Sequence, residues 1–170
     1  MRLDGDLKGA LEDFRPDMVA VTALTTEVYA AQDILAAVKD FAGEIVTVIG
    51  GHHVTLIPED FFLPFVDVIA RGEGELVFPA LVEAVQKGTS LAGVPNVIWQ
   101  DGQGRFVDNG RQVGRLDMDA LPMPRRDLTD AYRSEYFWLF DKPDTSVVTG
   151  RGCPYRCNFC SVWTFYGGKT

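Results

Sequence analysis

The chain has 170 residues, 46% hydrophobic and 24% charged, with a formal net charge of −8, which is typical of a globular protein with room for one domain or slightly more. The acidic balance argues against nucleic acid as the main partner, because phosphate contacts need clustered lysine and arginine. No run of about 18–20 apolar residues could span a membrane, and the N-terminus lacks a signal peptide's apolar core, so we expect a cytoplasmic protein.

The first half of the chain alternates between two kinds of apolar pattern. Apolar residues at helical spacing predict helices, and short, almost entirely apolar runs predict strands covered on both faces. In chain order the predictions are a helix (5–15), a strand (18–24), a helix (28–42), a strand (45–49), a short helix (58–63), a strand (67–70) and a helix (76–87). This alternation predicts right-handed βαβ units and a parallel sheet.

The second half has a different pattern. Residues 96–100 and 105–108 flank a glycine-rich turn and predict an antiparallel hairpin. Two prolines within 116–127 predict an extended linker, and the aromatic-rich stretch 129–140 predicts a short helix. Residues 145–149 predict a further strand that leads into a cysteine-rich loop.

These elements predict three parts. Residues 1–93 are expected to form a doubly wound, Rossmann-like α/β domain, residues 94–143 a hairpin and linker, and residues 144–170 the start of a second domain. Because the chain begins on a helix with no strand before it, the α/β domain is expected to lack its first βαβ unit. The last cysteine lies close to Thr170, too close for the chain to enclose a cofactor there.

All three cysteines of the chain lie in this loop, as Cys153, Cys157 and Cys160 with the spacing C-x-x-x-C-x-x-C. Three clustered thiols in a chain without a secretion signal indicate metal or cofactor ligands. Thiolates suit zinc or iron–sulfur clusters, but structural zinc needs four ligands, and the histidines, His52 and His53, are far upstream. A four-iron cluster with one open iron is favoured over zinc and over unliganded core cysteines.

Residues 150–160, Gly-Arg-Gly-Cys-Pro-Tyr-Arg-Cys-Asn-Phe-Cys, resemble the signature of the radical S-adenosylmethionine (radical SAM) family. The resemblance implies that Cys153, Cys157 and Cys160 hold a [4Fe-4S] cluster in a TIM-like barrel. In that family S-adenosylmethionine chelates the open iron and is cleaved to a 5′-deoxyadenosyl radical. Phe159 would lie beside the adenine. The S-adenosylmethionine contacts that come later in the family's barrel are absent from this chain. The chain alone is therefore not expected to catalyse the reaction.

A second motif, Gly50-Gly51, follows a buried strand, where glycines allow close approach of a ligand to the backbone. Taken alone, the glycine pair is more typical of a tight strand-to-helix turn than of a ligand site. Together with Thr22-x-Leu24 it is similar to the pairing in cobalamin-binding domains that cradles the cofactor's nucleotide tail, and 71–75 resembles the form fused to radical SAM enzymes. The cofactor contacts implied by this resemblance are Thr22, Leu24, Gly50, Gly51, His53, Thr55, Gly72 and Glu73.

The two resemblances together imply a cobalamin-dependent radical SAM enzyme, most simply a C-methyltransferase acting on a small molecule or lipid with an external one-electron reductant. A cyclase or ring-rearranging enzyme, a non-catalytic cobalamin or redox sensor, and a zinc-stabilised α/β domain remain alternatives. The Asp-x-His-x-x-Gly motif of many cobalamin domains is missing, which leaves the lower axial ligand unknown. Without the first βαβ unit, cobalamin binding by residues 1–170 is expected to be weak.

Overall fold

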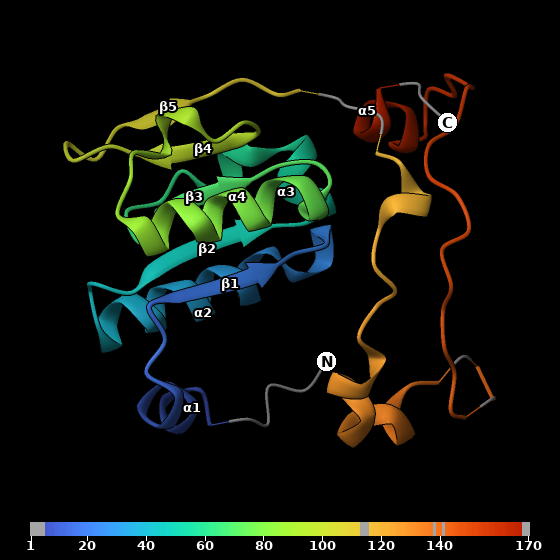
Figure 1. Ribbon diagram of the computed structural model, residues 1–170, viewed down its shortest axis with the longest axis horizontal. Coiled ribbons are helices and arrows are strands. Elements are labelled where there is room, and N and C mark those ends of the chain that lie inside the picture. Colours follow the sequence, from blue (N-terminus) through green and yellow to red (C-terminus); the bar gives the residue numbers. More distant parts are fainter. Residues whose placement is uncertain (1–5, 113–115, 138, 141, 168–170) are drawn as a thin grey trace. The chain divides into compact units, whose positions relative to one another are not determined.

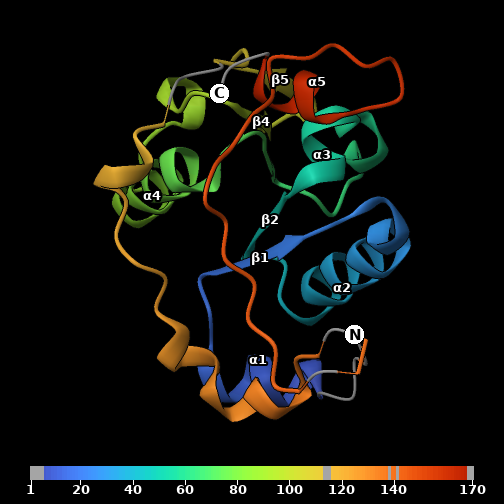
Figure 2. The same ribbon diagram turned by 90° about the vertical axis from the view of Figure 1, so that its right-hand side faces the viewer.

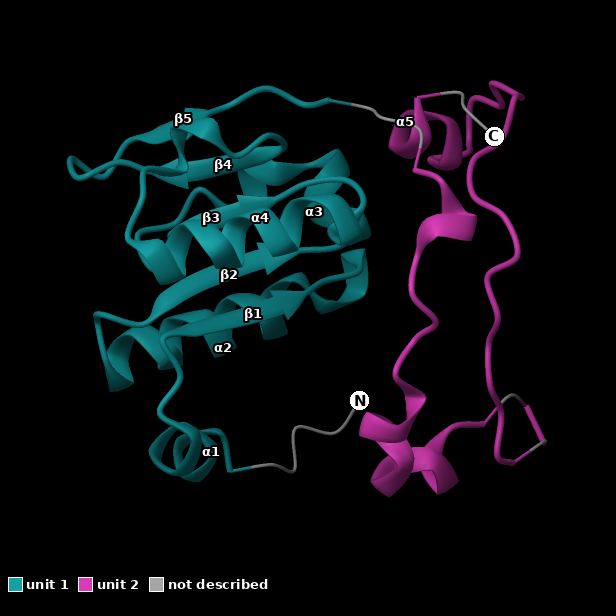
Figure 3. Ribbon diagram, viewed as in Figure 1, with its two compact units in different colours: residues 1–113 teal, residues 114–170 magenta. Residues whose placement is uncertain are grey.

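The computed structural model describes residues 6–112, 116–137, 139–140 and 142–167. The chain divides into two units, Met1–Val113 and Gly114–Thr170 (Figure 3). The first unit contains the sheet and its helices, and the second is built mainly of extended segments and short helical turns.

The first unit is organised around a five-stranded sheet with the order β1-β2-β3-β4-β5 (Figure 1). The first three strands run parallel, and the last two are antiparallel. The strands are β1 (Met18–Thr22), β2 (Val46–Gly50), β3 (Val68–Ala70), β4 (Val97–Gln100) and β5 (Phe106–Asp108). The sheet is therefore mixed rather than purely parallel.

Helices cover both faces of this sheet. Figure 2 shows α4 (Gly74–Lys87) on one side and α2 (Val28–Phe41) with α3 (His52–Leu56) on the other. Successive strand residues face opposite ways, so Ile49 packs with the core beneath α2 and α3. Val48 packs with the core beneath α4. The short 3₁₀ turns are η1 (Thr25–Glu27), η2 (Pro58–Phe61) and η3 (Leu91–Gly93).

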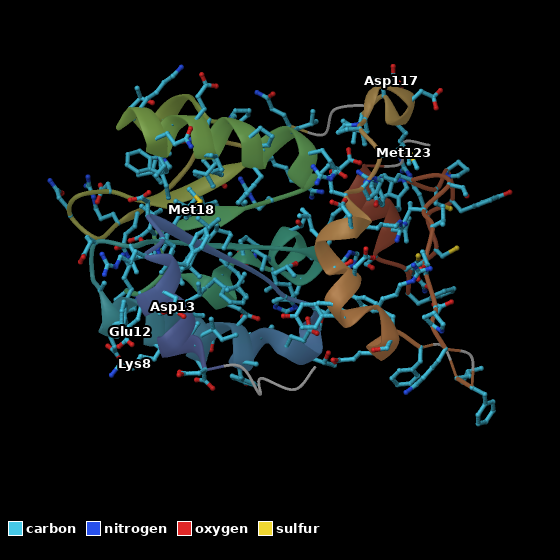
Figure 4. The ribbon with its side chains drawn as sticks, turned by 60° about the horizontal axis from the view of Figure 1, so that its bottom comes forward. Lys8, Glu12, Asp13, Met18, Asp117 and Met123 are labelled. Carbon is cyan, nitrogen blue, oxygen red and sulfur yellow. The ribbon has the colours of Figure 1, made fainter. Side chains whose placement is uncertain are left out.

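Helix α1 (Leu7–Phe14) closes a third, smaller core. Its buried residue Leu11 packs with Val38 and Ile45. The opposite side of the helix is polar, and Lys8 and Glu12 lie there one turn apart (Figure 4). The helix ends at Phe14, and the next residue, Arg15, adopts a left-handed backbone conformation with φ of 49°.

The structure confirms most predicted elements of the first half and corrects two points. Helix α3 follows Gly51 directly and was not predicted, because five residues, His52–Leu56, are too few to show a helical period. The predicted hairpin was assigned to the linker region 94–143, but β4 pairs with β3. This places the hairpin in the sheet of the first unit, which extends the unit past residue 93.

The second unit contains η4 (Met118–Ala120), η5 (Arg126–Glu135) and α5 (Val162–Tyr166). The helical prediction for 129–140 is met in part by η5. The strand predicted over 145–149 is absent from the described residues, where Val147 and Val148 are exposed. A strand needs a neighbouring strand to pair with. Here the carbonyl of Ser146 accepts from the Arg126 side chain at 2.9 Å, and the described residues show no strand over this segment, so the prediction of a first barrel strand is not met.

No helix among the described residues has both the length and the apolar character required to cross a bilayer.

A buried polar network holds the amino ends of β2 and β3 together. The hydroxyl of Thr47, fully buried, lies 2.8 Å from the carbonyl of Phe65 and accepts from the backbone N–H of Asp67 at 3.1 Å. Lys39 Nζ lies 2.6 Å from the Asp67 carboxylate and donates to the carbonyl of Ile45. The network satisfies polar groups that strand ends would otherwise leave unpaired.

Replacing Thr47 with valine is expected to lower the free energy of unfolding by about 1–3 kcal/mol, because the shape is kept while the partners of the hydroxyl are left unsatisfied. Urea unfolding of the whole chain would measure this. The matched control is Thr26→Val at an exposed position, which should change stability little. Equal unfolding midpoints for the two variants would contradict the role given to the network.

Candidate functional site: the carboxyl edge of the parallel strands

The predicted cofactor residues of the first unit meet where β1, β2 and β3 end. Thr22, the last residue of β1, is in register with Gly50, the last residue of β2. The N–H of Ala23 donates to the carbonyl of Gly50 at 3.0 Å, and the N–H of His53 donates to the carbonyl of Ala23. The sheet therefore brings the Thr22 and Gly50-Gly51 motifs together, as the sequence predicted.

Gly51 is required by this geometry. Its φ is +107°, a conformation that residues with a side chain rarely adopt. A Cβ at this position would lie 2.5 Å from Thr22 Oγ1 and 2.9 Å from both the backbone N and O of Ala23. The glycine thus permits the tight junction between the end of β1 and the start of α3.

A pocket of about 390 Å³ opens at this edge of the sheet. Small residues at the strands make room for it, and the first turns of α4 form another wall. The lining residues that come from the strands and the loops after them are Ala20, Val21, Thr22, Val48, Gly50, Gly51, Ala70, Arg71 and Gly72. The volume falls in the range of about 300–1,000 Å³ found for small-molecule sites, so the pocket suits a nucleotide-sized group.

Thr55 connects two walls of the pocket. Its hydroxyl donates to the carbonyl of Gly51 at 2.9 Å and accepts from the N–H of Gly72 at 2.9 Å. The side chain is buried. The predicted residues Thr55 and Gly72 are therefore joined directly, and the loop after β3 is held against the loop after β2.

Replacing Thr55 with valine should release the Gly72 loop and weaken ligand binding at the pocket by roughly tenfold, because two buried hydrogen bonds are lost. Titration with cobalamin, the cofactor predicted for this edge, would measure the loss. Thr47→Val is the matched control: it removes a similar network at the opposite ends of the strands. Equal affinities in both variants would show that Thr55 affects stability alone.

His53 is placed inside the protein. It is 4% exposed, with Nδ1 3.1 Å from the hydroxyl of Thr25 and Nε2 2.9 Å from the carboxylate of Asp60. Its ring also lies edge-on to Phe61. Both ring nitrogens are thus engaged in joining η1 to η2, which fits a structural role, and contact with a cofactor stays a prediction.

Leu24 and Glu73 occupy loops at the same edge. Leu24 is 55% exposed, an unusual position for a large apolar side chain, and its N–H is held by the Glu27 carboxylate at 3.0 Å. Glu73 is the N-cap residue of α4, where a carboxylate is favoured by the helix dipole. Neither residue is among those lining the pocket.

Arg71 was not among the predicted site residues, although it lines the pocket. It follows β3 directly and is 8% exposed. Its Nη2 donates to the Asp108 carboxylate, while its Nε–H has no partner within the described part of the chain. Burial, and next the charge of Arg71, lower the pKa of nearby Arg111. The available sequence signal was its position directly after a predicted strand, at the start of the stretch 71–75.

The three cysteines lie in the second unit. All are free thiols, and Cys157 is exposed while Cys153 and Cys160 are partly buried. The N–H of Cys160 donates to the carbonyl of Cys157 at 3.1 Å, which forms a turn. The described residues contain no group of three or more potential ligands gathered closely enough for a metal ion, so the predicted convergence of the thiols is not seen.

Aromatic residues flank the cysteines. Phe159 is 89% exposed and so presents its ring to solvent beside Cys160. The guanidinium of Arg156 lies 4.5 Å from the ring centroid of Trp163 in α5, a cation–π contact that ties the loop to the helix after it. Of the three thiols, that of Cys157 is the exposed one.

Residues 4–82 match the family described as the B12 binding domain. Three curated relatives align along most of the chain. An uncharacterized methyltransferase of Pyrococcus horikoshii is 34% identical over 96% of this chain and 35% of its own length. The hopanoid C-3 methylase of Methylococcus capsulatus is 34% identical over 95% and 31%. The anaerobic magnesium-protoporphyrin IX monomethyl ester cyclase of Rubrivivax gelatinosus is 30% identical over 96% and 30%.

The fold is also found in a solved structure. The cobalamin-dependent S-adenosylmethionine radical enzyme OxsB, with aqua-cobalamin and S-adenosylmethionine bound, superimposes with a TM-score of 0.70 and 23% identity over 89% of this chain and 21% of that chain. This likeness shows the fold. The chain spans about a third of the length of the curated relatives named above.

Proposed function

We propose, on the premise that the chain contains the B12-binding domain of the cobalamin-dependent radical SAM methyltransferase family, that this domain binds cobalamin by its nucleotide tail. The observation that carries the proposal is the 390 Å³ pocket at the ends of β1, β2 and β3. Thr22, Gly50 and Gly51 line it, and these are the residues whose pattern is typical of cobalamin domains.

The residues present fit this group. Side chains are small where the strands end, so a flat heterocycle can pack against backbone. Thr22 is exposed at the pocket and offers a hydroxyl, while the N–H of Gly72 is already engaged by Thr55. Leu24 is exposed at the same edge and offers apolar area to a bound cofactor. In this arrangement the protein positions the tail and excludes water from it.

The cysteine loop would hold the second cofactor. Three free thiols with the spacing of Cys153, Cys157 and Cys160 suit a [4Fe-4S] cluster with one iron left for S-adenosylmethionine. Phe159 would face the adenine. When bound, the cluster with S-adenosylmethionine would supply an organic radical, and cobalamin would supply a methyl group.

The complete protein would accordingly be a C-methyltransferase that acts on a small molecule or lipid and takes electrons from an external one-electron reductant. Support for methyl transfer comes from the methyltransferase relatives, and support for a lipid substrate from the hopanoid methylase. The substrate itself would be chosen by residues outside this chain.

The second candidate is a cyclisation or ring rearrangement by the same cofactors. The observation that favours it is the 30% identity to a cyclase. A module that senses cobalamin without turnover is a third alternative, which predicts cofactor binding but no consumption of S-adenosylmethionine.

The test is anaerobic incubation of the product of the complete reading frame, loaded with iron, sulfide and cobalamin, with S-adenosylmethionine and a reductant. The proposal predicts formation of 5′-deoxyadenosine together with S-adenosylhomocysteine, the product left when S-adenosylmethionine gives up its methyl group. 5′-Deoxyadenosine alone would favour the cyclase alternative. Loaded protein that forms neither product would contradict the enzyme and favour the sensor.

A further inference from the structure

Arg71 is a buried cation at the wall of the pocket. Its side chain is 9% exposed and is paired with Asp108 of β5, whose own side chain is 49% exposed. The Nε–H is buried without a partner in the residues that the structure describes. Leaving a donor of a charged group unpaired in the interior is costly, so a single carboxylate does not account for the burial of this guanidinium.

A second guanidinium lies nearby. Burial, and then the charge of Arg71, lower the pKa of Arg111, so the surroundings of Arg71 carry further positive charge. A bound anion would give the buried Nε–H of Arg71 an acceptor. Guanidinium groups bind phosphate oxygens especially well, because their N–H donors match the geometry of the oxygens.

The pocket itself narrows the identity of the anion. Apart from Arg71 and Thr22, its lining consists of apolar and glycine residues, including Gly50, Gly72 and Val77. This suits a ligand with a largely apolar body and one localised negative charge. Under the proposed function, the group with that chemistry is the nucleotide tail of cobalamin, an apolar base joined to the corrin through a phosphodiester.

We propose that Arg71 binds the phosphodiester of the cobalamin tail and thereby selects corrinoids that carry the phosphate over those that lack it. The inference rests on the proposed function and adds a specificity-determining residue to it. Asp108 would act as a positioning residue that holds the guanidinium at the pocket wall and, by its charge, partly opposes the phosphate.

The test compares three probes by spectroscopic titration of the whole chain: cobalamin, cobinamide, which lacks the phosphate and base, and cobinamide phosphate, which has the phosphate but lacks the base. The wild-type chain should bind cobinamide phosphate roughly tenfold more tightly than cobinamide. Arg71→Gln should remove this difference, and its circular dichroism spectrum and urea unfolding transition show that the variant is folded. Arg105→Gln, in the exposed hairpin, is the control and should keep the difference.

Asp108→Asn should change the preference for cobinamide phosphate in the direction opposite to Arg71→Gln. The amide keeps the shape but removes a negative charge, so the preference for cobinamide phosphate over cobinamide should increase several-fold, whereas a merely structural role would weaken both probes together. Equal binding of both probes by the wild type, or equal losses in Arg71→Gln, would overturn the phosphate contact and leave the cobalamin assignment intact. Wild-type chain that binds neither cobalamin nor cobinamide would overturn both.

Discussion

Replacing Gly51 with alanine should abolish saturable cobalamin binding and lower the free energy of unfolding by about 2–4 kcal/mol. Two effects add. The backbone at φ +107° is strained for any residue with a Cβ, and that Cβ would lie 2.5 Å from Thr22 Oγ1 and 2.9 Å from the backbone of Ala23. Because these neighbours include backbone of the β1–α2 connection, relief of the clash must open the junction between the motifs.

Two measurements test this. Urea unfolding gives the stability, and a cobalamin titration without denaturant, at a temperature where the variant is folded, gives the affinity. Gly43→Ala is the matched control, because Gly43 has no positive φ and its Cβ would meet no atom within 4 Å. It should behave like the wild type in both assays. Wild-type affinity in folded Gly51→Ala would show that the close approach at the strand ends has no part in cobalamin binding.

Replacing Cys157 with alanine should prevent assembly of the four-iron cluster. Three thiolates already leave one iron without a cysteine, and the two that remain cannot hold the cube. Anaerobic reconstitution followed by iron and sulfide analysis and absorption spectroscopy would measure the loss. The expected result is a fall from about four irons per chain to near none, with cobalamin binding unchanged, because the pocket lies in the other unit.

Tyr155→Phe is the control for this variant, since Tyr155 lies between the first two cysteines and is 73% exposed. It should assemble a normal cluster. A full four-iron cluster in Cys157→Ala would mean that the ligands have been wrongly assigned. Retention of one zinc per wild-type chain, with no iron–sulfur absorption, would instead support the zinc alternative.

The sheet of the first unit could be predicted because its signals are local. Apolar runs such as 45–49 are long enough to be identified as strands, and α2 was predicted within one residue of its observed end at Phe41. The pairing of the strands was harder to predict from the sequence. The hairpin was recognised, but its attachment to β3 depends on contacts such as Ile69 with Ile98, which no local pattern reveals.

The structure brings together the motifs that the sequence predicts for a cofactor site, whereas the residues that form the walls of the pocket were not predicted. Thr22, Gly50 and Gly51 are characteristic in sequence, and the structure brings them together. Ala20 and Ala70 create the space of the pocket, but an alanine in an apolar run carries no signal of its own. Arg71 likewise looked like part of a loop until its burial was known.

The cysteine loop illustrates the opposite case. A metal or cofactor role for this loop stays a prediction from spacing alone, because clustered thiols in a short loop are typical of ligands. The geometry expected of such a site is not seen: the described residues bring no three ligands together, and the strand expected over 145–149 is not formed there. Both would depend on neighbours that supply hydrogen bonds and on a cluster that draws the thiolates together.

The central claim is that the tail of cobalamin occupies the pocket at the ends of β1, β2 and β3. Hydrogen–deuterium exchange of the whole chain with and without cobalamin tests it directly. The account predicts slower exchange in peptides that contain Ala23, Gly51 and Gly72, and unchanged exchange around the Thr47 network at the opposite strand ends. Protection confined to that opposite end, or no protection at saturating cobalamin, would contradict it.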